Sequence, residues 1–215
     1  MDESFARAYA TLAATYRRDW VWAWGDAEAS ERQALYNAEK AVALDGILPH
    51  GHKQLALIYA YQRQHDMAIK EAEEAVQLDP GDADNYAVLA EVLNYAGPFQ
   101  RAVTNIQTAM RLDPYHSAHY AYVLGQAYYL LGDYPKAEEA LNASLNRNSS
   151  FIPARAYRAA VYWEMNRKQE AGAEMQEIRK VIPTPAAQRK SSAPFKDAAI
   201  TDRLRATWTA AEEAQ

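Results

Sequence analysis

The chain has 215 residues, of which 49% are apolar and 24% are charged, and it has a net charge of -5 and no cysteine. This composition is typical of a globular protein, and the lack of cysteine excludes disulfides, thiolate metal ligands and thiol nucleophiles. The acidic balance predicts no nucleic-acid partner, because phosphate binding needs clustered Lys and Arg. No apolar run approaches the roughly 20 residues of a spanning helix, so we expect no direct membrane insertion. The start MDESF lacks the positive charge of a signal peptide, which makes the cytoplasm the default compartment.

The first pair of predicted helices is stretched. FARAYATLAATY has the pattern of one helix and ALYNAEKAVALDG that of the next. Tyr16 and Ala34 are 18 residues apart, whereas the equivalent Tyr59 and Ala68 of the next unit are 9 apart. We therefore expect an expanded loop between these two helices, over about residues 17–33. It carries three tryptophans that either pack on their own unit or contact a partner: Trp20, Trp22 and Trp24.

Four further units follow, each with two helical patterns separated by a short turn such as Gly97-Pro98. Intervals of 34 or 35 residues separate the ends of the units, at Gly46, Pro80, Pro114, Ser149 and Pro183. A period of this size indicates stacked units, none of which buries its own apolar face alone. We predict an all-α solenoid of five helical hairpins over residues 1–183, and such a solenoid presents a long surface to other molecules.

After Pro183 the periodicity stops. Residues 184–196 are rich in Ala, Pro, Ser and basic residues, which predicts a linker. Residues 197–215 then form a final predicted helix with Asp197 as its N-cap. Ile200, Leu204 and Trp208 recur every four residues on one face of this helix. We expect this face to cap the exposed apolar side of the last repeat.

Columns of small residues carry a resemblance to a known family. The eighth position of each unit has Ala56, Ala90, Gly125 and Ala159, and the twentieth has Ala68, Ala102, Ala137 and Ala171. In this respect the chain resembles the tetratricopeptide repeat (TPR), where a small side chain on one helix receives a bulky one from its partner. Ser149 in place of proline and Arg158 in place of leucine depart from the family pattern. The resemblance implies a right-handed superhelix of helical hairpins.

A narrower resemblance extends over nearly the whole chain. DESFARAYATLAATYRRDW, VLGQAYYLLGDYPKAEEAL and APFKDAAITDRL are similar to TPR segments found C-terminal to bacterial class III adenylate/guanylate cyclase-type domains. The cyclase catalytic domain itself is not in this sequence, so no cyclase activity is implied. The resemblance implies instead a regulatory or oligomerisation module.

The TPR resemblance also implies which residues face a concave groove, because the first helix of each unit lines it. The expected groove residues are Arg18, Lys53, Gln54, Tyr61, Glu91, Asn94, Tyr95, Tyr122, Gln126, Tyr129, Tyr157 and Trp163. Tyrosine offers contact area and a hydrogen-bonding tip at a small entropy cost, although tyrosine at these columns also suits packing between adjacent helices. The carboxylate clamp of chaperone-binding TPR domains is expected to be absent, because Leu57 and Glu91 stand where Asn is needed.

No cofactor, metal or catalytic site is expected. His116 and His119 are spaced to share a helical face, but no third ligand accompanies them. No serine or histidine lies in a strand–turn–helix elbow or beside a Gly-rich phosphate loop.

We therefore expect a non-enzymatic scaffold that binds a protein or peptide through the Tyr-rich groove. Two alternatives stay open, a small-ligand sensor and a homo-oligomeric scaffold. A closed apolar pocket beside the Trp insertion favours a small ligand, and an open Tyr-lined channel favours a peptide. If Tyr61, Tyr95, Tyr122 and Tyr129 are buried between helices, the proposed peptide site is lost.

Overall fold

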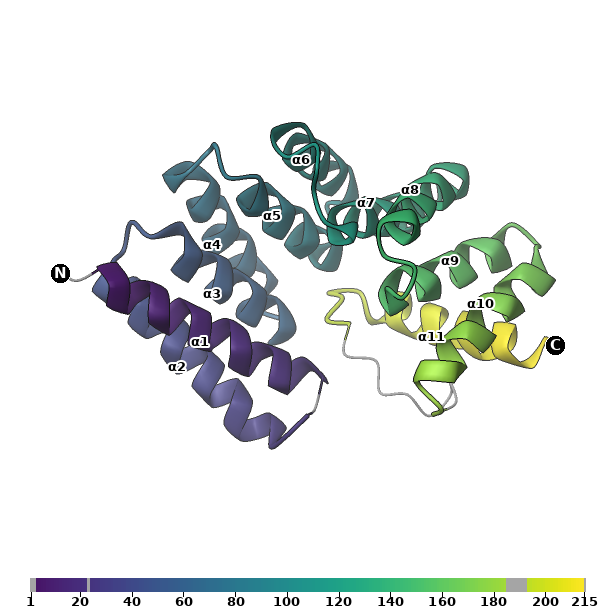
Figure 1. The fold of residues 1–215 in the computed structure, drawn as a ribbon, viewed down its shortest axis with the longest axis horizontal. Helices are drawn as coiled ribbons and strands as arrows, with labels where there is room; N and C mark the ends of the chain where they lie inside the picture. Colours follow the sequence, from purple (N-terminus) through teal and green to yellow (C-terminus); the bar gives the residue numbers. More distant parts are fainter. Residues whose placement is uncertain (1–2, 23, 185–192, 215) are drawn as a thin grey trace.

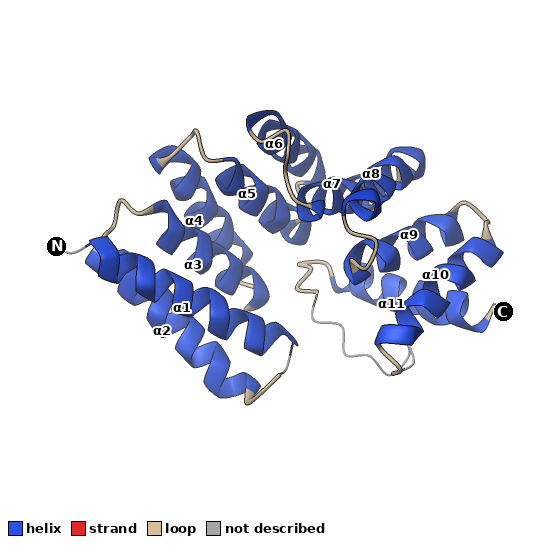
Figure 2. Ribbon diagram, in the orientation of Figure 1, coloured by secondary structure: helices blue, strands red, loops and turns tan. Residues whose placement is uncertain are grey.

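The computed structural model describes residues 3–22, 24–184 and 193–214, and within them every regular element is a helix (Figures 1 and 2). The helices are α1 (Glu3–Trp22), α2 (Ala27–Leu44), α3 (Pro49–Tyr61), α4 (His65–Leu78), α5 (Ala83–Ala96), α6 (Phe99–Leu112), α7 (Ala118–Leu131), α8 (Tyr134–Arg147), α9 (Ile152–Glu164), α10 (Lys168–Val181) and α11 (Ala198–Glu213). The predicted all-α solenoid is confirmed.

The helices form an arch of stacked hairpins (Figure 1). Each odd-numbered helix from α1 to α9 packs on its even-numbered partner and on the next odd-numbered helix. The odd-numbered helices therefore lie side by side along the inner surface of the arch. The main core runs between the hairpins and includes the fully buried Ile106, Leu141 and Leu93.

The same turn, built on an aspartate or asparagine, ends each of the first four hairpins and recurs at intervals of 34 or 35 residues. The side chains of Asp45, Asp79, Asp113 and Asn148 each accept a hydrogen bond from the backbone N–H two residues further on, at 3.2, 3.0, 3.0 and 3.1 Å. Asn and Asp side chains favour this turn because they replace a backbone acceptor. The turn therefore persists at Asn148, in the unit where Ser149 stands in place of proline.

The small residues of the eighth and twentieth positions are buried at the contact between paired helices. Ala56, Ala90 and Ala159 are fully buried there, and Gly125 occupies the same column in α7. A Cβ atom on Gly125 would lie 2.6 Å from Cγ of Leu141 and 3.3 Å from the carbonyl oxygen of Ala137. Alanine fits in the other three hairpins, but the fully buried Leu141 leaves room only for glycine in this one.

We expect Gly125→Ala to lower the free energy of unfolding by about 1–3 kcal/mol, because the added methyl group overpacks a buried contact. The measurement is urea denaturation followed by circular dichroism. Gly81→Ala is the matched control, since its Cβ would meet only Oδ1 of Asp79 at 3.4 Å. An unchanged midpoint for Gly125→Ala would mean that α7 and α8 are not packed this closely.

The expanded loop expected over about residues 17–33 is wrong. The extra residues lengthen both helices of the first hairpin, because α1 continues to Trp22 and α2 begins at Ala27. Asp26 caps α2 by accepting a hydrogen bond from the backbone N–H of Ala29 at 3.0 Å. The insertion lacks a helix breaker before Gly25, so both helices extend into it. The long α1 brings Trp22 to the inner surface of the arch.

The C-terminal helix α11 packs against α9 and α10. Leu204 is buried, and the indole Nε1 of Trp208 donates a hydrogen bond to the carbonyl oxygen of Ala156 at 2.6 Å. Of the linker predicted for residues 184–196, residues 185–192 lie outside the described residues. Residues 193–196 are not a linker: Pro194 and Phe195 are buried on the inner surface of the arch.

Candidate functional site

Two adjoining cavities lie on the inner surface and together form what we call the concave groove. The apolar cavity has a volume of about 260 Å³ and the polar cavity a volume of about 540 Å³. Both are lined by Val21, Trp22, Tyr61, Tyr95, Tyr122 and Pro153. The groove thus takes side chains from every inner helix, from α1 to α9.

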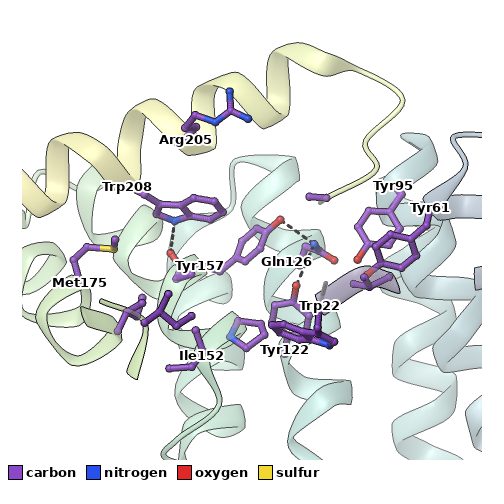
Figure 3. Close-up of a pocket in the computed structure, with 16 residues that line it drawn as sticks. Trp22, Tyr61, Tyr95, Tyr122, Gln126, Ile152, Tyr157, Met175, Arg205 and Trp208 are labelled. Carbon is purple, nitrogen blue, oxygen red and sulfur yellow. Dashed lines mark hydrogen bonds between the residues drawn. The ribbon is translucent and has the colours of Figure 1, made fainter. Parts of the chain in front are cut away.

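The apolar cavity lies between the inner helices and α11 (Figure 3). Tyr157 and Trp208 line its C-terminal side, with ring centroids 6.2 Å apart in an edge-to-face arrangement. The amide of Gln126 donates a hydrogen bond to the hydroxyl of Tyr157 at 2.8 Å, which fixes the ring against α7. This end of the groove therefore offers aromatic faces with few free polar groups.

The polar cavity carries charged side chains from α1, α3, α5 and α7. Lys53 is paired with Asp82 at 2.9 Å, and Nε2 of His119 lies 3.1 Å from the Glu91 carboxylate. Arg17 and Arg18 line the same cavity from α1. The arginines add two positive charges to this cavity, which Asp84 and Glu91 also line, and Arg17 lies close enough to Glu91 to lower the pKa of that carboxyl.

The tyrosines of the groove remain neutral at physiological pH. Burial raises the pKa of Tyr61 to about 12 and raises the pKa of Tyr95 and Tyr122 well above 10. Their hydroxyl groups therefore act as uncharged hydrogen-bonding groups, as in the contact from Tyr95 to Glu91 at 3.3 Å.

Glu91 and His119 shift each other's pKa in opposite directions. Burial disfavours the charged form of both, but the hydrogen bond and charge of Glu91 outweigh it and raise the pKa of His119 above 6.5. Likewise, His119 and Arg17 outweigh burial and lower the pKa of Glu91 below 4.5. The pair is thus charged on both sides at mildly acidic pH.

This pairing predicts a pH-dependent contribution to stability. The raised pKa of His119 means that its contribution is complete below about pH 6.5 and is lost as the pH rises through the raised pKa. The lowered pKa of Glu91 means that its contribution is present above about pH 4.5 and is lost as the pH falls through the lowered pKa. The unfolding free energies of the wild type and His119→Gln should therefore differ most between about pH 5 and 6, by up to about 1 kcal/mol.

Urea denaturation at a series of pH values measures this difference. In a Glu91→Gln background, His119→Gln should lose its pH dependence. A difference that instead grows above pH 8 would contradict the ion pair.

Most of the predicted groove residues line the two cavities. Arg18, Lys53, Gln54 and Glu91 line the polar cavity, Gln126 and Tyr157 the apolar one, and Tyr61, Tyr95 and Tyr122 both. Tyr95, Tyr122 and Tyr157 are nevertheless buried, so each offers a ring edge or face to the groove rather than a free side chain. Of the four tyrosines whose burial decides the peptide site, Tyr95, Tyr122 and Tyr129 are buried and Tyr61 is half-buried. The groove therefore keeps Tyr61 and Trp22 as its more open aromatics.

Three predicted groove residues do not line either cavity. Tyr129 is fully buried between Tyr134 and Tyr157, with centroid distances of 5.9 and 5.6 Å. Asn94 is fully buried and donates hydrogen bonds to the carbonyl oxygen of Val123 and to Oε1 of Gln126, both at 3.0 Å. Trp163 lies at the end of α9 under the ammonium group of Lys168, 3.4 Å from the ring centroid. The expectation that Tyr129 and Asn94 contact a partner in the groove is wrong, because packing between adjacent helices buries both. Trp163 is partly buried outside both cavities, and its contact with a partner stays a prediction.

The three tryptophans of the first hairpin separate into two groups. Trp20 packs edge-on against Tyr61 with centroids 6.0 Å apart. Trp22 and Trp24 stack on each other at 6.4 Å and are 53% and 71% exposed. Only Trp22 lines the groove, so self-packing holds for Trp20 and an open surface remains at Trp22 and Trp24.

Sequence reasoning missed a residue from outside the repeats that packs at the edge of the groove. Phe195 packs on Tyr95 inside the arch, and Arg63, from the turn between α3 and α4, donates a hydrogen bond to its carbonyl oxygen at 2.7 Å. The available signal was an isolated Pro194-Phe195 pair in a stretch otherwise rich in small and polar residues.

The histidines considered as metal ligands are used otherwise. His116 stacks on Tyr120 with centroids 5.4 Å apart, and His119 is paired with Glu91. Among the residues that the structure describes, no three His, Asp or Glu side chains gather as a metal site would require. Likewise, no helix in the described ranges is long and apolar enough to cross a membrane.

Family models of the tetratricopeptide repeat match residues 49–82 and residues 81–150. Within residues 49–150 the chain therefore matches the tetratricopeptide repeat. TPR proteins generally act as protein-interaction scaffolds that bind protein or peptide partners. No curated protein matches the chain.

Solved structures, two of them described as TPR proteins, have the same fold. The thermophilic TPR protein TTC0263 of Thermus thermophilus is 23% identical, with a TM-score of 0.67 over 91% of this chain and 98% of its own. PilW, a type IV pilus biogenesis factor, is 20% identical, with a TM-score of 0.69 over 97% of this chain and 90% of its own. YrrB, described as a TPR protein with an unusual peptide-binding site, is 16% identical, with a TM-score of 0.55 over 83% of this chain and 92% of its own. At these identities the similarity shows the fold alone.

Proposed function

We propose that this protein is a non-enzymatic scaffold that binds a peptide segment of a partner protein in the concave groove. One observation carries the proposal: the two cavities share six lining residues and so form a single groove across all five inner helices. A groove of this length suits an extended or helical peptide, which contacts several repeats at once.

The two ends of the groove differ in chemistry. Arg17 and Arg18 stand at one end, and the rings of Tyr157 and Trp208 stand at the other. A peptide with an acidic residue at one end and an apolar or aromatic residue at the other would match both. The arginines would set orientation and the aromatic rings would supply most of the affinity.

A peptide-display selection against the full chain tests this function. Selected peptides are synthesised, and their affinities are measured by fluorescence anisotropy for the wild type, Trp22→Ala and Arg18→Glu. We expect Trp22→Ala to bind about 10-fold more weakly, as for an aromatic contact at an interface, and Arg18→Glu to lose acidic peptides in particular. Tyr115→Ala is the matched control, because Tyr115 is 92% exposed and lies outside both cavities.

Equal affinity for all four proteins would show that the groove is not the peptide-binding surface.

The selection also separates the peptide function from its main alternative, the binding of a small ligand. The apolar cavity of about 260 Å³, with Trp22 on its rim, favours a small apolar ligand, although it is slightly smaller than usual ligand pockets of about 300–1,000 Å³. Such a ligand would raise the melting temperature of Arg18→Glu and the wild type equally, whereas an acidic peptide would not.

The resemblance to cyclase-associated segments supports a regulatory setting for the same groove. In a protein that also carried a cyclase-type domain, peptide binding would act on that domain through the TPR array.

A homo-oligomeric role predicts a mass that rises with protein concentration in analytical ultracentrifugation, and a constant monomer mass would exclude it.

A further inference from the structure

A segment of the chain itself lies at the edge of the concave groove: Ala193 lines the apolar cavity, and Phe195 packs on Tyr95, which lines both cavities. Residues 193–196 leave the N-terminus of α11 and extend into the hollow of the arch, toward α3 and α5 (Figure 1). We call these residues the docked segment. Their contacts are with a part of the chain about 100 to 130 positions earlier in the sequence, so they are tertiary contacts and not a local turn.

Two hydrogen bonds hold the backbone of the docked segment. The N–H of Lys196 donates to the carbonyl oxygen of Tyr95 at 2.8 Å. Tyr95 lies in the last turn of α5, where helix carbonyls have no partner within the helix. The guanidinium of Arg63 donates to the carbonyl oxygen of Phe195 at 2.7 Å. Both bonds involve only the backbone of the segment, so an extended peptide of another sequence could form them.

The side chains supply the selective contacts. Phe195 is fully buried, and its ring meets that of Tyr95 edge to face with centroids 5.5 Å apart. Pro194 is buried beside it, and Ala193 lines the apolar cavity. The ammonium group of Lys196 lies 3.5 Å from the carboxylate of Asp66. An aromatic ring, a proline before it and a basic residue after it therefore define the chemistry of this position.

The backbone of Arg63 is in the left-handed region, with φ of 60°. This conformation is costly for a residue with a Cβ atom. Gly97 and Gly132 occupy the equivalent turns of the next two hairpins, at intervals of 34 and 35 residues. The turn between α3 and α4 thus has arginine at a position where glycine would adopt the backbone conformation without strain. The side chain of this arginine binds the docked segment.

We propose that residues 193–196 are an intramolecular ligand at the edge of the concave groove, on Tyr95 and Arg63, and that the partner is an extended peptide with a proline–aromatic–basic sequence that displaces them. This inference rests on the proposed peptide-binding function and specifies its partner. Binding then requires release of the docked segment, so the free chain binds such a peptide more weakly than a chain whose segment lacks its phenylalanine. The arch itself need not change shape, because the incoming peptide re-forms the contacts with Tyr95 and Arg63.

The test uses the full chain with Phe195→Ala and a fluorescent peptide of residues 193–198, APFKDA. By anisotropy, we expect the peptide to bind Phe195→Ala at least about 10-fold more tightly than the wild type. The peptide APAKDA is the matched control and should bind neither protein. Equal affinity of APFKDA for the two proteins, or no binding to a folded Phe195→Ala, would overturn the inference.

A second measurement does not depend on how well Phe195→Ala folds. Because the chain has no cysteine, Lys196→Cys carries a single spin label on the last residue of the docked segment. Adding APFKDA in excess should release the segment and raise the mobility of the label, whereas APAKDA should leave it unchanged. A label that stays immobile with saturating APFKDA would refute displacement.

The outcomes separate this inference from the function on which it rests. If display-selected peptides bind in a Trp22-dependent manner but Phe195→Ala does not change their affinity, the groove binds peptides and the docked segment is only structural. If neither selected peptides nor APFKDA bind any variant, both proposals fail. A wild type that doubles its mass while Phe195→Ala stays monomeric would mean that the segment docks into a second copy, which also overturns the intramolecular assignment.

Discussion

Replacing Tyr129 by alanine should lower the free energy of unfolding by about 3–5 kcal/mol, as for other fully buried aromatic side chains. The ring is completely buried and packs against Tyr134, Tyr157 and the guanidinium of Arg203, which lies 5.4 Å from its centroid on α11. Alanine would leave a cavity at the junction of α7, α9 and α11, which the surrounding helices cannot close fully. Urea denaturation with a single fitted slope measures the change.

Two controls show whether this loss comes from burial. Tyr115→Ala removes the same side chain from a position that is 92% exposed, and should change stability by no more than about 0.5 kcal/mol. Tyr129→Phe keeps the ring and removes only the weak contact from the hydroxyl to Glu164 at 3.4 Å, so most of the stability should remain. A stable Tyr129→Ala that had lost peptide binding would instead make Tyr129 a contact residue of the groove.

The second large effect is expected at Glu174, where one carboxylate joins two arginines. Its two oxygens bind Arg155 at 3.0 Å and Arg158 at 2.5 Å, and the three side chains are only 10%, 19% and 18% exposed. Removing the shared acid by Glu174→Ala leaves two poorly solvated cations against each other. We therefore expect a loss of about 3–5 kcal/mol in the free energy of unfolding.

Glu73→Ala is the matched control for Glu174→Ala. Glu73 also pairs with an arginine, Arg101 at 2.6 Å, but both side chains are largely open to solvent. An exposed pair contributes about 0–1 kcal/mol. Similar effects of the two substitutions would show that the pairs on α9 and α10 are no better shielded than those on the surface. High salt should weaken the Glu73 pair more than the Glu174 pair.

The Glu174 cluster also explains a departure from the repeat pattern. Arg158 stands where the family usually has leucine, and its neighbour Glu174 on α10 accepts its hydrogen bond while Asn142 on α8 accepts another at 2.7 Å. An apolar contact between hairpins is replaced here by a polar one with partners on both sides. The departure therefore involves three residues from three helices, which a single column of the repeat does not reveal.

The predicted groove residues also differ because of neighbours that their repeat columns do not reveal. Tyr95 and Tyr129 belong to the same class of predicted groove position, yet Tyr95 lines the groove and Tyr129 does not. The difference arises because α11 and Tyr134 pack around the ring of Tyr129, while Tyr95 lies in the hollow of the arch beside the docked segment. Both α11 and the docked segment lie outside the repeats, so the periodic pattern does not place them beside these tyrosines.

The sequence alone determined the all-α solenoid, the hairpin boundaries near each turn and the inner helices, because these depend on local patterns that recur every 34 or 35 residues. Small residues, turn-forming Asp and Asn, and helix-ending glycines act within one hairpin or between neighbours. Residues that break the period required the tertiary structure. The burial of Asn94 and Tyr129 depends on which side chains the neighbouring helices bring to them, and the docking of Phe195 on Tyr95 depends on a contact between segments that no repeat relates. Helix periodicity specifies on which side of a helix a residue lies, but not which other segment covers that side. Packing across the inside of the arch therefore decided which side chains remain exposed to a partner.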